Sequence, residues 1–280
     1  MKARNMLFGF VAMILIILAG CGAGETEQSS EVNETPSAWE KIEESGKIVV
    51  GTEGTYFPVT YVDQETKELT GFDVEVVREL ASRLGIEAEF KTMEFDGILP
   101  SLRSGTIDLA ANDFTVTPER EEKFLFTEPY KYSYGSAIVR EEDNSGIFST
   151  EDLEGKKTGG SVTSNYADFA RNNGAEVVAY SGTDGILNDI LIGRIDAYLN
   201  DHLVLLQEIE RYNRPGLKVA EDVKYEPNVG AFVMVKGNTE VKEKLDSVIQ
   251  EMREDGTIKE IALKFYGADV SNPVELEETK

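Results

Sequence analysis

Short apolar runs alternate with amphipathic segments along most of this 280-residue chain, and this alternation limits the folds that are possible. Residues 47–51 (KIVVG) form an apolar run that ends at a glycine, which is typical of a buried parallel strand. Residues 73–84 (DVEVVRELASRL) place apolar side chains at helical spacing, and Gly85 follows in the position of a C-cap. This order predicts an α/β fold with a largely parallel sheet. We expect further strands at residues 59–62, 88–91, 107–111, 137–140, 176–180 and 195–199, and further helices at residues 97–103, 165–172, 183–192, 201–212, 240–252 and 258–265.

The strand–helix order occurs twice along the sequence. It runs from residue 47 to residue 111 and begins again at residue 137, so we expect two α/β lobes. Ligands of α/β proteins bind beyond the carboxyl ends of the strands, and clefts between lobes are preferred sites. The pattern therefore predicts a two-lobed protein with a central ligand cleft.

The N-terminal segment has the features of a lipoprotein signal. Lys2 and Arg4 are the only charged residues before Cys21, and residues 6–18 are almost wholly apolar. That run is short for a membrane-spanning helix but suits a secretory signal. Cys21 is the only cysteine and follows Leu-Ala-Gly, which resembles the lipobox of bacterial lipoproteins. We expect residues 1–20 to be removed and lipidated Cys21 to anchor an extracytoplasmic protein to the cell membrane. The alternatives are an ordinary signal peptide with a chance cysteine, or an uncleaved anchor.

A polar segment separates Cys21 from the folded protein. Residues 21–38 are rich in Gly, Ser, Glu and Thr, and Val32 is their only large apolar residue. Such a segment buries too little surface to offset the entropy of ordering it, so we expect a flexible tether. The folded protein is expected to begin near Trp39.

The composition excludes several classes of function. A formal charge of −24 and a pI near 4.4 argue against a nucleic-acid partner, because little here would neutralise phosphates. One cysteine excludes a disulfide framework, and one histidine argues against a His-rich metal site or a Ser-His-Asp triad. We favour solubility in a saline or alkaline exterior as the role of the negative charge, over steering of cationic ligands.

Two segments that follow predicted strands carry charges of opposite sign. Residues 115–120 (TVTPER) follow one strand, and the guanidinium of Arg120 can grip a carboxylate bidentately beside the Thr115 hydroxyl. Asp201 follows a strand of the second lobe, and its carboxylate can hold an ammonium group. An Arg that faces an Asp across a cleft fits a zwitterion. The alternatives are that Arg120 pairs with a neighbouring Glu and that Asp201 caps the next helix.

Two further groups of residues are candidates for the pocket. Residues 159–165 (GGSVTSN) precede a predicted helix, where backbone N–H groups and small hydroxyls suit an anion, although a plain capped turn is the alternative. No P-loop lysine is present, which argues against nucleotide binding. We expect Tyr56, Phe57 and Phe95 in loops after strands, where aromatic side chains can form pocket walls or simply join the core.

Five motifs, taken in order, resemble the family 3 extracellular solute-binding proteins. The motifs are residues 51–56 (GTEGTY), 69–74 (LTGFDV), 115–120 (TVTPER), 124–130 (FLFTEPY) and 255–258 (DGTI). The resemblance implies a periplasmic-binding-protein-like fold of type II, with hinge strands near residues 132–135 and 228–230. It divides the chain into lobe 1 (residues 39–132 and 229–267), lobe 2 (residues 133–228) and a tail (residues 268–280).

The resemblance also implies roles for charged residues. Arg120 matches the residue that binds the ligand α-carboxylate, and Thr115 matches the first threonine of that motif. Asp201 matches the residue that binds the ammonium group. Glu53 matches an acidic residue of the first loop, whereas Asp113 stands where small or amide residues are common and adds negative charge to the pocket.

The remaining site residues follow in the same way. Tyr56 and Phe95 match aromatic residues that stack on the ligand. Thr163 and Ser164 match a carboxylate-binding turn of lobe 2 that is often Gly-Thr, and the absent glycine leaves the backbone shape of this turn open.

Members of this family capture polar amino acids for ABC importers, so we expect a monomeric receptor that delivers its ligand to importer permease subunits. Residues 51–56 together with residues 161–166 (SVTSNY) are most similar to the L-cystine-binding branch, which makes L-cystine the leading candidate. A cationic amino acid is the alternative, favoured by Glu53, Asp113 and the acidic composition. A dehydratase-type enzyme on the same scaffold is a further alternative. No nucleophile–base pattern or metal spacing supports it, so we expect no catalytic residues, no metal and no cofactor.

Overall fold

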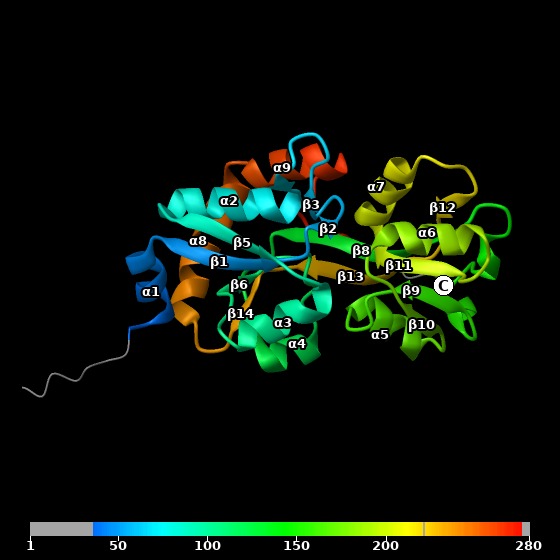
Figure 1. Ribbon diagram of the computed structural model, residues 1–280, viewed down its shortest axis with the longest axis horizontal. Helices are drawn as coiled ribbons and strands as arrows, with labels where there is room; N and C mark the ends of the chain where they lie inside the picture. Colours follow the sequence, from blue (N-terminus) through cyan, green and yellow to red (C-terminus); the bar gives the residue numbers. More distant parts are fainter. Residues whose placement is uncertain (1–35, 221, 276–280) are drawn as a thin grey trace, which may run out of the picture. The chain divides into compact units, whose positions relative to one another are not determined.

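The computed structural model of the protein describes residues 36–220 and 222–275 (Figure 1). The predicted signal peptide, Cys21, the tether up to residue 35 and the last five residues of the tail lie outside these ranges. Within them, no helix combines the length and the apolar character that crossing a membrane requires.

The described residues form helices and strands in alternation. The helices are α1 (Ala38–Ser45), α2 (Phe72–Leu84), α3 (Phe95–Arg103), α4 (Pro118–Lys123), α5 (Asn165–Asn172), α6 (Thr183–Leu191), α7 (His202–Tyr212), α8 (Thr239–Glu254) and α9 (Thr257–Tyr266). The strands are β1 (Lys47–Thr52), β2 (Thr55–Tyr56), β3 (Thr60–Val62), β4 (Leu69–Thr70), β5 (Glu87–Thr92), β6 (Leu109–Ala110), β7 (Phe124–Phe126), β8 (Lys131–Arg140), β9 (Lys157–Gly160), β10 (Glu176–Ala179), β11 (Ala197–Asp201), β12 (Leu217–Val219), β13 (Tyr225–Gly230) and β14 (Val233–Val235).

The first sheet, which defines lobe 1 here, has the strand order β5-β1-β6-β14-β7. Strand β1 pairs in parallel with β5 and β6, whereas β14 pairs antiparallel with β6 and β7. A late segment of the chain therefore completes a sheet that the earliest strand begins. Helices α2, α8 and α9 supply one core of this lobe, and α3 packs in a second core through Ile98 and Leu102.

The second sheet, which defines lobe 2, has the order β10-β9-β11-β8-β12, with β13 also paired to β8. Strand β9 is parallel to β10 and β11, whereas β8 runs antiparallel to β11, β12 and β13. Helix α5 packs in one core of this lobe, and α6 and α7 pack in the other. Each lobe is thus a sheet between helical layers.

Two strands join the lobes. The ten-residue strand β8 pairs with β13, with Tyr132 opposite Val229, and Gly230 at the end of β13 forms a bridge with Thr115 of lobe 1. Figure 1 shows β8 and β13 running from one lobe into the other. The prediction of a two-lobed α/β fold with two connecting strands is confirmed.

Several predicted elements differ in detail. The strand expected over residues 107–111 is shorter and covers only β6, although the amides of Asp108 and Ala111 on either side of it still donate to the Val49 and Gly51 carbonyls. The Asp108 carboxylate also accepts a 2.9 Å hydrogen bond from the Val49 amide. Phe95 begins α3 and Tyr56 lies in β2, so our assignment of both residues to loops was wrong. The strand expected over residues 137–140 is the second half of the longer β8.

Helix α1 is an element that the apolar pattern did not predict. Ser37 and Glu40 form a reciprocal capping box at its start, and Gly46 ends it in a left-handed conformation. Trp39 and Ile42, spaced three residues apart, are buried on its inner side. These two buried apolar side chains are enough to hold α1 in place, because α8 and β1 lie beside this helix.

Candidate functional site

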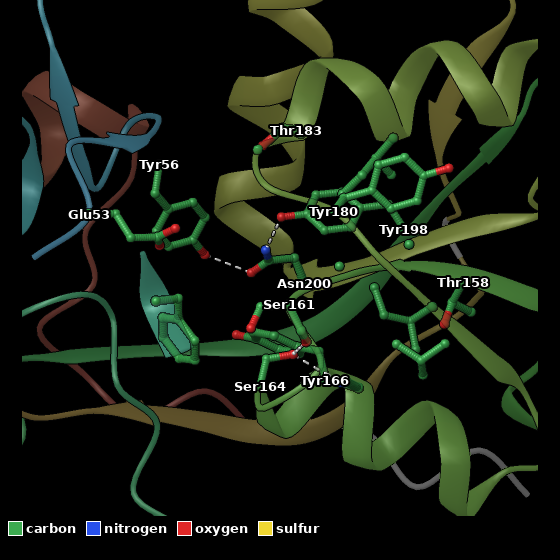
Figure 2. Close-up of a pocket in the computed structure, with 18 of the residues that line it drawn as sticks. Glu53, Tyr56, Thr158, Ser161, Ser164, Tyr166, Tyr180, Thr183, Tyr198 and Asn200 are labelled. Carbon is green, nitrogen blue, oxygen red and sulfur yellow. Dashed lines mark hydrogen bonds between the residues drawn. The ribbon is translucent and has the colours of Figure 1, made fainter. Parts of the chain in front are cut away.

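A cavity lies between the two lobes, where the carboxyl ends of several strands meet (Figure 2). Lobe 1 contributes residues that follow β1 and β6, and lobe 2 contributes residues that follow β9 and β10 or end β11. The cavity's volume, measured as the space that the centre of a water-sized sphere can occupy, is about 80 Å³. The main polar and aromatic side chains that line it are Glu53, Tyr56, Phe95, Asn112, Ser161, Ser164, Tyr166, Tyr180, Thr183, Tyr198 and Asn200.

Glu53 places a partly exposed carboxylate at this cavity. Its Oε2 accepts a 2.7 Å hydrogen bond from Asn112 Nδ2, and its backbone amide donates to Asn112 Oδ1 at 2.9 Å. Burial raises the pKa of Glu53 to about 7; the hydrogen bond from Asn112 opposes this rise, and the nearby acids Glu94 and Asp96 add to it. Glu53 is therefore a possible cation acceptor whose charge changes near neutral pH.

Aromatic residues form much of the cavity wall and also link the lobes. The Tyr56 hydroxyl donates a 2.7 Å hydrogen bond to Asn200 Oδ1, and Asn200 Nδ2 donates to the Tyr198 hydroxyl (Figure 2). Phe95 stacks on Phe114 with their ring centroids 5.2 Å apart. Such a wall offers flat apolar faces together with hydroxyl groups, which suits a small ligand with both apolar and polar parts.

The turn between β9 and α5 contacts both the cavity and lobe 1. Ser164 lines the cavity and caps α5, since its hydroxyl accepts a 3.1 Å hydrogen bond from the Ala167 amide. The hydroxyls of Ser161 and Thr163 donate to Asp96 Oδ1 of α3, at 2.6 and 2.5 Å. Thr163 therefore faces Asp96 in lobe 1, and it is not among the residues that line the cavity.

Arg120 lies on α4 and is buried. Its Nη1 donates a 3.0 Å hydrogen bond to the Thr115 carbonyl, and its guanidinium carbon lies 5.3 Å from the ring centroid of Phe114. Among the described residues, no carboxylate oxygen lies within 4 Å of this guanidinium. Burial lowers the pKa of Arg120, and the nearby Tyr166 and Asp168 oppose this change. The group remains a cation that can accept an anionic partner.

Asp201 belongs to a buried cluster instead of the cavity lining. Its Oδ1 caps α7 by accepting from the amides of Leu203 and Val204, at 3.0 and 3.3 Å. Its Oδ2 lies 2.7 Å from Asn228 Nδ2 and 3.1 Å from Lys131 Nζ. The helix-capping role considered for Asp201 is thus present, and its remaining acceptor sites contact this protein's own side chains.

Only some of the predicted site residues line the cavity. Glu53, Tyr56, Phe95 and Ser164 line the cavity, whereas Thr115, Arg120, Thr163 and Asp201 do not. Thr115 is linked to Asp201 through Asn228, which hydrogen-bonds both side chains. The sequence reasoning missed Asn112, Asn200 and Lys131 among others. Asn112 follows β6 and Asn200 lies near the carboxyl end of β11, and these positions were the signal that would have found them.

The arrangement suits recognition of a small charged molecule. A carboxylate, several hydroxyls and the N-termini of α5 and α6 face the cavity. Within the described ranges, no group of three His, Cys, Asp or Glu side chains is placed to hold a metal ion.

Comparisons with known proteins agree with this geometry. A model of the bacterial extracellular solute-binding proteins, family 3, matches residues 48–268. The chain is 41% identical to the probable ABC transporter extracellular-binding protein YckB of Bacillus subtilis (strain 168), over 99% of this chain and 96% of that protein. It is 38% identical to the L-cystine-binding protein TcyA of the same strain, over 96% of this chain and 99% of that protein. A solved structure of the amino acid ABC transporter substrate-binding protein AbpA from Streptococcus pneumoniae Canada MDR_19A, bound to L-arginine, is similar with a TM-score of 0.75 and 29% identity, covering 83% of this chain and all of that one.

Proposed function

Because this chain belongs to the family 3 bacterial extracellular solute-binding proteins, we propose that it is a receptor that binds L-cystine and delivers it to an ABC importer. The similarity to an L-cystine-binding protein over nearly the whole chain supports this choice of ligand. In this proposal the receptor is monomeric, extracytoplasmic and attached to the membrane through lipidated Cys21, and the importer permease subunits are its partners.

The observation that carries the proposal is that both lobes line one cavity. A ligand that contacts both lobes binds the closed arrangement better than the open one, and this difference is what drives closure. Glu53 and Tyr56 contribute from lobe 1, and Ser164 and Asn200 contribute from lobe 2.

L-Cystine has two zwitterionic ends, and the cavity offers positions for both. We place one carboxylate at the N-terminus of α5 beside Ser164. Arg120 and Thr115 do not line the cavity, so in this proposal the Arg120 guanidinium turns from the Thr115 carbonyl toward the ligand carboxylate, and Thr115 supports it from lobe 1. A second carboxylate is suited to the N-terminus of α6, which begins after Gly182 without a side-chain cap. Phe95 and Tyr56 supply apolar surface for the disulfide between the two ends.

Calorimetry on protein freed of bound ligand by unfolding, dialysis and refolding tests the proposal. We expect saturable heat with L-cystine and weaker binding of L-arginine and L-glutamine. Absence of heat with every amino acid, from protein whose circular dichroism shows correct refolding, contradicts the proposed function.

Arg120→Ala tests the assigned carboxylate contact. A hydrogen bond to a charged group is worth about 1.5–3 kcal/mol, so we expect affinity for L-cystine to fall about ten- to a hundredfold or more. Arg214→Ala is the matched control, because Arg214 is exposed and distant in sequence from the cavity residues. Equal affinities for the two variants would refute the role given to Arg120.

A cationic amino acid is the second candidate, and Glu53 favours it because this carboxylate faces the cavity. The L-arginine bound to the AbpA structure supports the same candidate. Tighter binding of L-arginine than of L-cystine in the same titrations would select it. We propose that the protein is not an enzyme, and turnover of prephenate or arogenate would contradict this.

A further inference from the structure

Lys131 forms a buried ion cluster with two carboxylates from opposite lobes. Its Nζ lies 2.7 Å from Asp113 Oδ2 and 3.1 Å from Asp201 Oδ2, and all three side chains are completely buried. Asp113 follows β6 of lobe 1, Asp201 ends β11 of lobe 2, and Lys131 begins the connecting strand β8. One ammonium group of the protein itself therefore lies between the two carboxylates.

The acceptor sites of Asp201 are already filled. A carboxylate accepts about four hydrogen bonds, and Asp201 receives two from the α7 amides, one from Asn228 and one from Lys131. Its side chain has no exposed surface and is not part of the cavity lining. A ligand ammonium reaches this carboxylate only by displacing Lys131.

Asp113 is equally inaccessible to a ligand. Its side chain is unexposed, although its backbone borders the cavity, and its Oδ2 is held by Lys131. Its Oδ1 has no hydrogen-bond partner, but this oxygen is buried. Neither aspartate thus exposes a carboxylate oxygen to the cavity.

Glu53 is different from both aspartates. It is partly exposed and lines the cavity, and its Oε2 is held by Asn112 alone. Among the described residues that line the cavity, Glu53 is the one whose carboxylate is open to a ligand.

From these contacts we propose that Lys131 occupies the cation-binding position between Asp113 and Asp201, so that Glu53 binds the ligand's ammonium group. The inference rests on the proposed function, since it assumes an amino-acid ligand. In this proposal Lys131 determines specificity, because it keeps a ligand ammonium away from Asp113 and Asp201. A ligand is then selected for an ammonium that reaches Glu53. Asp201 acts only in positioning α7 and Lys131.

Two ligands that differ only in their ammonium groups distinguish the role of Glu53 from that of Asp201. L-Cystine and 3,3′-dithiodipropionic acid share the disulfide and both carboxylates, but the second lacks ammonium groups. The readout is the ratio of the Kd of the diacid to the Kd of L-cystine, measured by calorimetry. We expect Glu53→Gln to lower this ratio about ten- to a hundredfold, because the ion-paired hydrogen bond is lost only for L-cystine. We expect Asp201→Asn to change both Kd values by the same factor and to leave the ratio unchanged.

Lys131→Met supplies a rescue test. Without its ammonium, the position between the aspartates is free for the ligand, so Glu53→Gln should no longer lower the ratio in this background. Thermal unfolding of each variant establishes that it is folded at the titration temperature, and the first two variants decide the question if Lys131→Met does not fold.

The outcomes are distinguishable. A ratio that falls in Asp201→Asn and not in Glu53→Gln overturns the inference and returns the ammonium to Asp201. Wild-type protein that binds no amino acid contradicts the proposed function itself. If L-arginine is the ligand, the matched pair is L-arginine and 5-guanidinopentanoic acid, which lacks only the α-ammonium, and the same variants apply.

Discussion

Lys131→Met should destabilise the protein far more than loss of an exposed lysine. The substitution keeps an unbranched chain of similar length but leaves Asp113 and Asp201 buried without their shared cation. Removing one partner of a buried ion pair costs about 3–5 kcal/mol, because an uncompensated buried charge remains. In a protein of this size, about 2–4 °C of Tm is lost per kcal/mol, so we expect a Tm lowered by about 6–20 °C.

Lys47→Met is the matched control for this effect. Lys47 pairs with Glu89, and their side chains are 45% and 39% exposed. Exposed pairs of this kind contribute about 0–1 kcal/mol. The control should therefore lower the Tm by no more than about 4 °C.

The deficit of Lys131→Met should also depend on pH. Burial raises the pKa of Asp113, the nearby Asp201 adds to the rise, and Lys131 opposes it. Removing Lys131 removes that opposition, so the variant's native state retains a proton that the unfolded state releases. Stability then falls as pH rises. We expect the difference from wild type to be smallest near pH 5 and larger at pH 8.

Urea unfolding followed by circular dichroism at both pH values provides the measurement. A Lys131→Met deficit no larger than that of Lys47→Met would refute the reasoning about the buried cluster. A deficit that shrinks as pH rises would refute the assignment of the cost to ionised aspartates.

Two further predictions concern the cavity and the backbone. Since the pKa of Glu53 is about 7, its carboxylate loses charge as pH falls through that value. L-Cystine affinity should then fall by up to about tenfold per pH unit below 7, and it should fall again above about pH 8, where the ligand's own ammonium groups lose their protons. Calorimetry between pH 5.5 and 8.5 measures this, and Glu53→Gln should show no fall below pH 7. Gly71→Ala should cost at least about 2 kcal/mol, because Gly71 has φ of 131° and an added Cβ would lie 2.3 Å from the Val59 carbonyl oxygen. Gly85→Ala, with φ of 70° and no atom within 4 Å of the added Cβ, should cost about 1 kcal/mol in urea unfolding; equal losses would contradict the steric argument.

Local patterns in the sequence predicted most helices and the early parallel strands. Helix α2 was predictable because apolar spacing and Gly85 agree on its span, and the structure begins it one residue earlier than expected. Strands β7 and β14 were not, because each is three residues long and owes its place to pairing between distant segments, with Val233 opposite Phe126. Pairing of that kind leaves no periodic signal in either segment.

The candidate site was predictable where a residue's position after a strand decides its role. Glu53 lines the cavity for that reason. The cation cluster was not predictable, because lysine is almost always exposed and nothing in the local sequence marks Lys131 as buried. Its burial depends on two aspartates that lie 18 residues before it and 70 residues after it in the sequence.

The contacts between the lobes determine how much a ligand must contribute to closure. Tyr56 bonds Asn200, Asp96 bonds the turn before α5, and Lys131 joins carboxylates of both lobes. The protein's own side chains thus hold the two lobes together in this arrangement, and a ligand shifts the equilibrium between arrangements only by its differential affinity. Selectivity among amino acids therefore depends on the few groups that reach the cavity. Glu53 and Asp113 are the acidic residues among the described residues that line it, and the Asp113 side chain is completely buried.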